Sequence, residues 1–122
     1  MNFKTPLIAL EFRSDDFDPR CRAIIREIDD QCFRKFNYNL TVTDVLREQN
    51  EEEKLNPKVK RSPHVERPSR AADIRTKDMS PEILLFVGNL ITFWWPECKL
   101  LRDDRGETSP HFHFHVPKRK EA

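Results

Sequence analysis

Apolar residues recur at helical spacing in the first third of the chain. They follow three- and four-residue intervals, which places them on one face of a helix: Ile24, Ile25, Ile28, Cys32 and Phe36. Asp18 supplies a capping side chain and Pro19 a proline at the first helical position. The pattern therefore predicts an amphipathic helix that begins at Pro19 and ends near Asn37.

A second apolar stripe follows Ser80 and Pro81, which form the same combination of cap and proline. The stripe predicts a helix with a wide buried face and an end at Pro96: Ile83, Leu84, Val87, Leu90, Ile91 and Trp94. Trp94 and Trp95 are adjacent, so they cannot both face the core from one helix. One of them either lines a groove or is a partly buried core residue.

The other predicted elements are short. Alternating β-branched residues over 40–45 and the segments 99–102 and 111–116 predict strands. Residues 7–12 predict a short strand or an ordered arm, residues 47–60 an exposed helix and loop, and residues 103–106 a turn. Strands and helices do not alternate regularly, which favours an α+β fold with a small antiparallel sheet packed with helices. The length predicts one domain over residues 1–122.

Charge and composition exclude several function classes. The 22 basic and 21 acidic residues nearly cancel, so the broad basic surface of a nucleic-acid-binding domain is not expected. The apolar stretch 83–95 is too short to cross a bilayer, and no membrane partner is expected. Three cysteines without a CxxC pair, and no secretory signal pattern, predict a reduced chain that is cytoplasmic on synthesis. Cys21 and Cys32 are interpreted as small apolar residues of the first helix.

All four histidines lie in two short segments, 62–78 and 107–116. In the second segment they alternate with apolar residues, and side chains on a strand alternate between faces. The alternation predicts one face with His111, His113 and His115, and an opposite face with Phe112, Phe114 and Val116. The phenylalanine face is suited to a core, and the histidine face to water, a ligand or a metal.

Two imidazoles and a carboxylate are a common ligand set for catalytic zinc. Three protein ligands leave the fourth tetrahedral position to water, whose pKa falls to about 7 on the metal. Asp73 and Glu107 are the acidic residues that accompany the histidines. The alternatives are a surface strand with chance histidines and a metal site without proteolytic activity.

The two segments resemble the zinc D-alanyl-D-alanine carboxypeptidases and phage endolysin peptidases, which share a metal site with the hedgehog signalling domain. The family motif S-x-H-x-x-G-R-A-x-D is similar to residues 62–74, and its later H-x-H to residues 110–113. The matching positions are Ser62, His64, Arg70, Ala71, Asp73 and Ile74, then Pro110, His111, Phe112 and His113. Eight residues separate His64 from Asp73, two more than is usual in the family, and Arg67-Pro68-Ser69 replaces the glycine. Residues 40–47 resemble the family strand that ends in a substrate-facing arginine.

The resemblance implies a Zn²⁺ cofactor held by His64, Asp73 and His113, with His115 as the alternative third ligand. It implies Glu107 as general base and His111 as a hydrogen-bond donor to the oxyanion.

Three further roles follow from the same resemblance. Arg47 would clamp a substrate carboxylate or the oxyanion. Arg70 would be structural and pair with a local carboxylate, and Ser62 would orient a ligand histidine. For Glu107 and Arg47 the alternative is an ordinary solvated side chain, and for Ser62 the start of a turn.

The implied function is a zinc metallopeptidase that hydrolyses peptide bonds in bacterial peptidoglycan stem peptides, of the D,D-carboxypeptidase or endolysin type. Its fold would be hedgehog-like, and the protein a monomer that acts on the cell wall after release or as a virion component. One alternative is a non-catalytic zinc-binding interaction domain of the same fold. A less favoured one is a small nucleic-acid-associated protein that uses Trp94, Trp95 and the basic tail.

Overall fold

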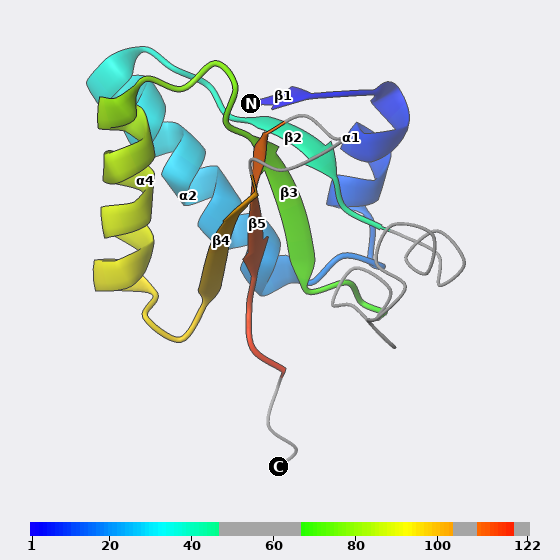
Figure 1. Cartoon of the computed structure of the whole chain (residues 1–122). Coiled ribbons are helices and arrows are strands. Elements are labelled where there is room, and N and C mark those ends of the chain that lie inside the picture. Colours follow the sequence, from blue (N-terminus) through cyan, green and yellow to red (C-terminus); the bar gives the residue numbers. More distant parts are fainter. Residues whose placement is uncertain (47–66, 104–109, 119–122) are drawn as a thin grey trace.

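The computed structural model describes residues 1–46, 67–103 and 110–118, and these form an α+β fold (Figure 1). The described elements are β1 (Asn2–Phe3), α1 (Pro6–Arg13), α2 (Pro19–Phe36), β2 (Thr41–Asp44), β3 (Ala71–Arg75), α4 (Pro81–Trp94), β4 (Lys99–Asp103) and β5 (His111–His115). The five strands make one sheet in the order β1-β2-β3-β5-β4. The helix and loop predicted over 47–60, and positions 104–106 of the predicted turn, lie outside the described residues.

The two amphipathic helices begin and end where the sequence predicts. The Asp18 carboxylate accepts the Arg20 backbone N–H at 2.8 Å at the start of α2, and Asn37 ends this helix in the left-handed conformation (φ 54°). The Ser80 hydroxyl accepts the Ile83 N–H at 3.2 Å at the start of α4. Both predictions are confirmed. The helix starts were predictable because capping depends on residues that are close together in the sequence.

The prediction of a strand or arm over residues 7–12 is wrong, since these residues belong to α1. Thr5 caps this helix by accepting the Ile8 N–H at 3.2 Å, and Pro6 occupies the first turn. Leucine, alanine and glutamate are good helix formers, and a short apolar run does not by itself distinguish a strand from a helix. Only Ile8 and Phe12 of α1 are buried.

The sheet is mixed, not purely antiparallel. β2–β3, β3–β5 and β5–β4 are antiparallel pairs, as expected, whereas β1 pairs with β2 in parallel. β3, which carries Asp73, is central in the sheet, although the sequence pattern predicted no strand over these residues. Residues 71–74 are all buried, so both faces of β3 are covered and its sequence lacks the alternation that marks a half-buried strand.

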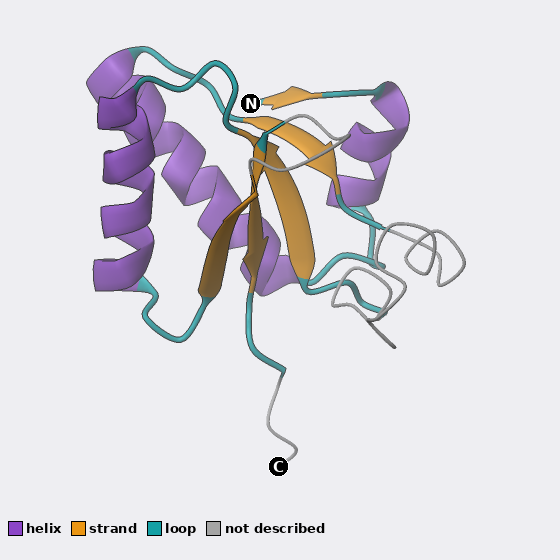
Figure 2. Cartoon of the chain, viewed as in Figure 1, coloured by secondary structure: helices purple, strands orange, loops and turns teal. Residues whose placement is uncertain are grey.

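The hydrophobic core is formed by the sheet and by buried residues of the helices α1, α2 and α4, whose places beside the sheet are seen in Figure 2. Ile24, Ile25, Ile28 and Cys32 of the predicted α2 stripe are buried there together with Cys21, whereas Phe36 is only partly buried against the core. This face of α2 shares the core with sheet residues such as Ile74 and Phe114. Burying one such large side chain contributes about 1.5–3 kcal/mol. All three cysteines are free thiols. None of the helices that the structure describes is long and apolar enough to span a membrane.

The buried face of α4 is narrower than predicted. Ile83, Val87 and Ile91 are buried as expected, but Trp94 is 67% exposed and its assignment to the core is wrong. Trp95 follows the helix as its C-cap and packs partly against the core. One of the two tryptophans therefore contacts the core, and it is the one outside the helix.

Candidate functional site

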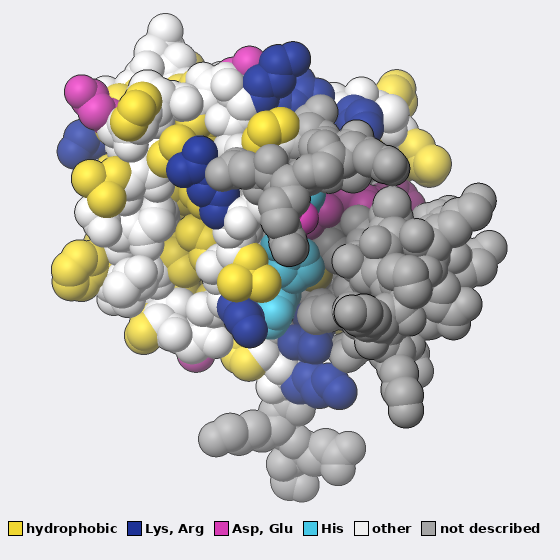
Figure 3. All heavy atoms as spheres, viewed as in Figure 1, with side chains coloured by type: hydrophobic (Ala, Val, Ile, Leu, Met, Phe, Trp, Pro, Cys, Tyr) yellow, Lys and Arg dark blue, Asp and Glu magenta, His cyan; other side chains and the backbone are white. Residues whose placement is uncertain are grey.

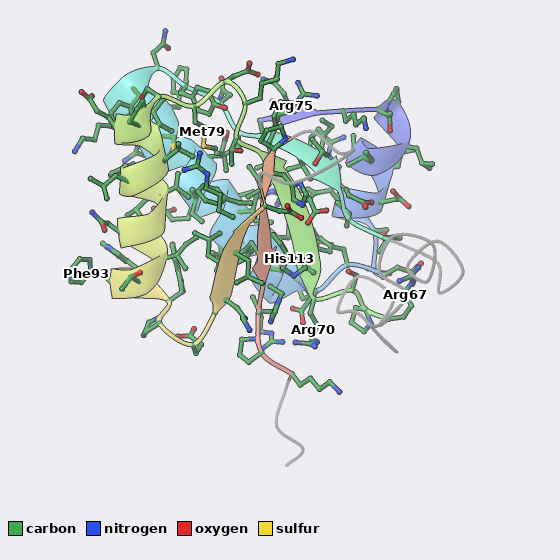
Figure 4. The ribbon with its side chains drawn as sticks, in the orientation of Figure 1. Arg67, Arg70, Arg75, Met79, Phe93 and His113 are labelled. Atoms are coloured by element: carbon green, nitrogen blue, oxygen red, sulfur yellow. The ribbon has the colours of Figure 1, made fainter. Side chains whose placement is uncertain are left out.

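Strand β5 separates two chemically different faces, as its alternation predicts. Phe112 and Phe114 are buried in the core with Val116. His111 and His113 keep side-chain exposures of 17% and 19% on the opposite face. Histidine side chains are visible at the surface there (Figure 3), and His113 projects from β5 beside β3 (Figure 4).

The register of the sheet places each of the three histidines of β5 between one residue of β4 and one residue of β3. Directly opposed residues of antiparallel strands share a face. Three rows therefore cross the histidine face, each running from β4 through β5 to β3: Lys99–His115–Ala71, Leu101–His113–Asp73 and Asp103–His111–Arg75.

The Asp73 carboxylate faces the terminal strand. Its Oδ1 lies 3.3 Å from Nδ1 of His113, and its Oδ2 lies 3.9 Å from Nε2 of His111. Asp73 is only 6% exposed. Because a buried carboxylate needs polar partners, the imidazoles supply part of the environment that keeps Asp73 on this central strand.

His113 uses both ring nitrogens. Its Nδ1 faces Asp73, and its Nε2 lies 3.0 Å from Nδ1 of His115, with the two rings inclined at 73°. A neutral imidazole has one donor and one acceptor nitrogen, so the tautomer of His113 is coupled to that of His115. The three side chains form a continuous polar chain along the histidine face.

Strand β2 completes the surroundings of Asp73 on the side away from β5. The Thr43 hydroxyl donates to the Asp73 carbonyl at 3.3 Å. Asp44 is the Cα partner of Asp73 after a register shift in β2, and its Oδ1 accepts the Val45 N–H at 3.0 Å. The sequence did not identify Asp44, because this shift changes the face on which a strand residue lies.

Two arginines hold the end of β5. Arg70 Nη1 donates to the Val116 carbonyl at 2.6 Å, and Arg20 Nη2 donates to the Pro117 carbonyl at 2.7 Å. The hydrogen bond to Asp18 raises the pKa of Arg20 and fixes its guanidinium. Arg70 thus has a backbone carbonyl among its partners, and its predicted pairing with a carboxylate stays a prediction. No sequence signal identified Arg20 as an anchor, since its target lies 97 positions away.

Buried Ser69 fixes the entry to β3. Its hydroxyl donates to the Val45 carbonyl at 3.0 Å, and its N–H donates to the Asp16 carbonyl at 2.7 Å. The Asp18 N–H donates to the Ser69 carbonyl at 2.8 Å. These contacts tie the start of β3 both to the end of β2 and to the loop before α2, and so hold Asp73 in position opposite β5.

The structure brings three of the predicted site residues together: Asp73, His111 and His113. The predicted ligand His64, the predicted base Glu107, and the predicted Arg47 and Ser62 lie outside the described residues. Lys99 and Leu101, which share the histidine face, were not predicted as site residues. The strand over 99–102 was expected, but its partner and register were not.

The donor chemistry of Asp73 and His113 fits a zinc ion. Two ligands of one tetrahedral zinc, at bonds of about 2.0–2.2 Å, lie roughly 3.4 Å apart. The 3.3 Å between Asp73 Oδ1 and His113 Nδ1 is close to that separation. Within residues 1–46, 67–103 and 110–118, no group of three His, Cys, Asp or Glu side chains is arranged to hold a metal. Those ranges contain only two of the three predicted ligands.

Comparison of the chain with protein-family models gives no match. Comparisons with curated proteins and with solved structures give no significant match either. The resemblance to zinc peptidases therefore rests on the motif residues of the sequence alone.

Proposed function

We propose that this chain is a zinc metallopeptidase that hydrolyses peptide bonds in bacterial peptidoglycan stem peptides, as a D,D-carboxypeptidase or an endolysin does. The observation that carries the proposal is the pairing of Asp73 with His113, 3.3 Å apart on adjacent strands. The hedgehog-type fold is part of the same proposal. Helices against one face of the sheet and polar chemistry on the other support it.

The zinc ligands would be His64, Asp73 and His113. His113 is favoured over His115 because it is the Cα partner of Asp73 and turns Nδ1 toward the carboxylate. His115 would then orient His113 through Nε2, the usual arrangement for a ligand histidine. When bound, zinc supplies a Lewis acid and lowers the pKa of water to about 7.

The chain's own groups would carry the proton and stabilise charge. Glu107 would take a proton from the attacking water and deliver it to the leaving amine. His111 lies one row along β5 from His113 and would donate a hydrogen bond to the substrate oxyanion. Arg47 would clamp a substrate carboxylate or the same oxyanion with its planar donors.

The partial exposure of the histidines suits a site that binds a peptide. Asp73 is nearly buried, whereas the His111 and His113 side chains are 17% and 19% exposed. A carboxylate held under imidazoles that reach the surface gives a preorganised site open to substrate from one side. We propose that the protein acts as a monomer, on the cell wall after release or as a virion component.

The test is hydrolysis of purified peptidoglycan and synthetic stem peptides by the zinc-loaded protein, with products identified by mass spectrometry. Activity should disappear with a chelator and return with Zn²⁺. Glu107→Ala should lower the rate at least about a hundredfold while zinc stays bound. Glu82→Ala is the matched control, because Glu82 is exposed at the start of α4.

The outcomes separate the alternatives. Zinc binding without hydrolysis of any wall peptide would favour a non-catalytic zinc domain. No zinc binding at micromolar metal would contradict both that domain and the peptidase.

A further inference from the structure

On the histidine face of the sheet, the side chains of Ala71 and Asp73 on β3 are buried, whereas those of Lys99 and Leu101 on β4 are exposed to solvent. On the β3 side Ala71 is fully buried and Asp73 is 6% exposed. On the β4 side Lys99 is exposed and Leu101 is 49% exposed. Figure 3 shows hydrophobic and basic side chains beside the histidines on this face. A ligand that reaches the histidines therefore has β4 side chains within its reach.

We propose that β4 forms a substrate-selecting wall of the site, in which Lys99 binds a carboxylate of the peptide and Leu101 contacts an apolar group next to the scissile bond. This proposal rests on the peptidase function proposed above. It adds the chemical class of peptide that the site selects, a peptide with an anionic group close to the bond that is cut.

The position of Leu101 follows from the register. Leu101 and Asp73 are the two Cα partners of His113, so an exposed apolar side chain adjoins the histidine that faces the carboxylate. Leu101 lies on the same side of the sheet as the histidines, while the core lies on the opposite side. A methyl or methylene group of a bound peptide would cover this leucine and remove apolar surface from water.

The position of Lys99 determines how far from the scissile bond the bound carboxylate of the peptide would lie. Lys99 is the Cα partner of His115, two residues along β4 from Leu101. Two residues of a strand span roughly 6.8 Å, and an extended peptide advances by about 3.4 Å per residue. A carboxylate bound by Lys99 would therefore lie within about two residues of a peptide bond held at His113.

Lys99 is available for this role. Within the part of the chain that the structure describes, it has no ion-pair partner, whereas Arg20 pairs with Asp18 and Arg34 with Asp30. Asp103 stands at the other end of β4, opposite His111. The wall thus presents a cation at the His115 end and a carboxylate at the His111 end. This charge distribution favours one orientation of a bound peptide along β4, with its anionic group at the Lys99 end.

The experiment compares a stem peptide with free carboxylates against versions in which one carboxylate at a time is a carboxamide. For zinc-loaded wild type, one amidated version should have a kcat/KM lower by on the order of fivefold, mainly through KM. Lys99→Gln should abolish this difference, and Lys99→Glu should reverse it. Lys4→Gln, at an exposed position on the segment between β1 and α1, should keep the wild-type preference.

Leu101→Asn tests the apolar contact with the same peptides. It should lower kcat/KM on every peptide and leave the carboxylate preference intact. Circular dichroism should match the wild type for all four variants, because the replaced side chains are exposed.

Equal rates of wild type on all peptides, or a preference that survives Lys99→Gln, would overturn the selecting wall and leave the peptidase standing. If the wild type cleaves none of the peptides, the peptidase proposal fails and the wall fails with it.

Discussion

Asp73 Oδ1 and His113 Nδ1 lie 3.3 Å apart although the residues are 40 positions apart in the sequence. They are Cα partners in the β3–β5 pairing. A slip of one residue would turn Phe112 or Phe114 to the histidine face and a histidine into the core. The buried phenylalanines therefore fix the register that brings Asp73 to His113, and packing on one face determines the chemistry on the other.

Asp73→Asn should weaken zinc binding. The substitution keeps the shape of the side chain but removes the negative charge that faces His113. Loss of an outer hydrogen-bond partner typically costs 10–100-fold in metal affinity, so loss of a ligand should cost at least about a hundredfold. The affinity is measured by competition with a chromophoric chelator, and the wild type should bind one zinc per chain.

Asp30→Asn is the matched control for this measurement. Asp30 lies on α2 and pairs with Arg34 at 3.1 Å with a half-exposed side chain, so its loss should leave zinc affinity unchanged. Equal zinc affinity of Asp73→Asn and wild type would remove Asp73 from the ligand set and, with it, the metal site proposed here.

Phe114→Ala should destabilise the fold strongly. Phe114 is fully buried between two histidines of β5, and truncating a buried phenylalanine costs about 3–5 kcal/mol. The free energy of unfolding is measured by urea denaturation. Phe93→Ala serves as control, since Phe93 is 80% exposed and points away from the molecule (Figure 4), and should change stability by less than about 0.5 kcal/mol. Similar losses for both variants would contradict the two-faced assignment of β5.

Asp18→Ala should cost more than an ordinary helix cap. Asp18 is 2% exposed, caps α2, and holds the Arg20 guanidinium that reaches the Pro117 carbonyl. Loss of the cap costs about 1 kcal/mol, and breaking the ion pair with the partly exposed Arg20 adds to this, so we expect roughly 2–3 kcal/mol. Ser80→Ala removes only the cap of α4 and should cost about 1 kcal/mol. Urea denaturation at pH 7 compares the two, and equal losses would show that the Arg20 anchor adds nothing.

The parts of the fold that the sequence predicted are those that local interactions determine. The caps at Asp18 and Ser80 act within one helical turn, so the starts of α2 and α4 were predictable. The alternation along β5 was equally local, and it predicted the histidine face. β3 was not predicted, because burial on both faces removes the alternation.

The site required information that the sequence does not carry locally. The partners of each histidine depend on strand register, which long-range packing determines. For this reason the motif could predict Asp73 as a ligand, but nothing indicated that Leu101 and Lys99 would lie opposite His113 and His115. The same holds for Arg20, whose contact with Pro117 closes a loop of almost the whole chain.

Stability should decline at alkaline pH because of the buried and partly buried thiols. Burial raises the pKa of Cys32 and of the partly buried Cys98 from 9.0 to about 11, and it also holds the pKa of Cys21 well above its usual range. The folded chain therefore keeps thiol protons that the unfolded chain releases above about pH 9. The stabilisation from Cys32 and Cys98 is fully present below pH 9 and is lost as pH rises toward about 11.

Urea denaturation at half-unit steps from pH 7.5 to pH 10.5 measures this decline. Cys32→Ala should lower the free energy of unfolding at neutral pH, because Cys32 is fully buried, and should also make the alkaline decline shallower. Val87→Ala truncates another fully buried core side chain, but one without a titratable group. It should also lower the free energy of unfolding, and it should keep the wild-type dependence of that free energy on pH. A slope for Cys32→Ala equal to that of Val87→Ala would show that the Cys32 thiol does not contribute to the alkaline decline.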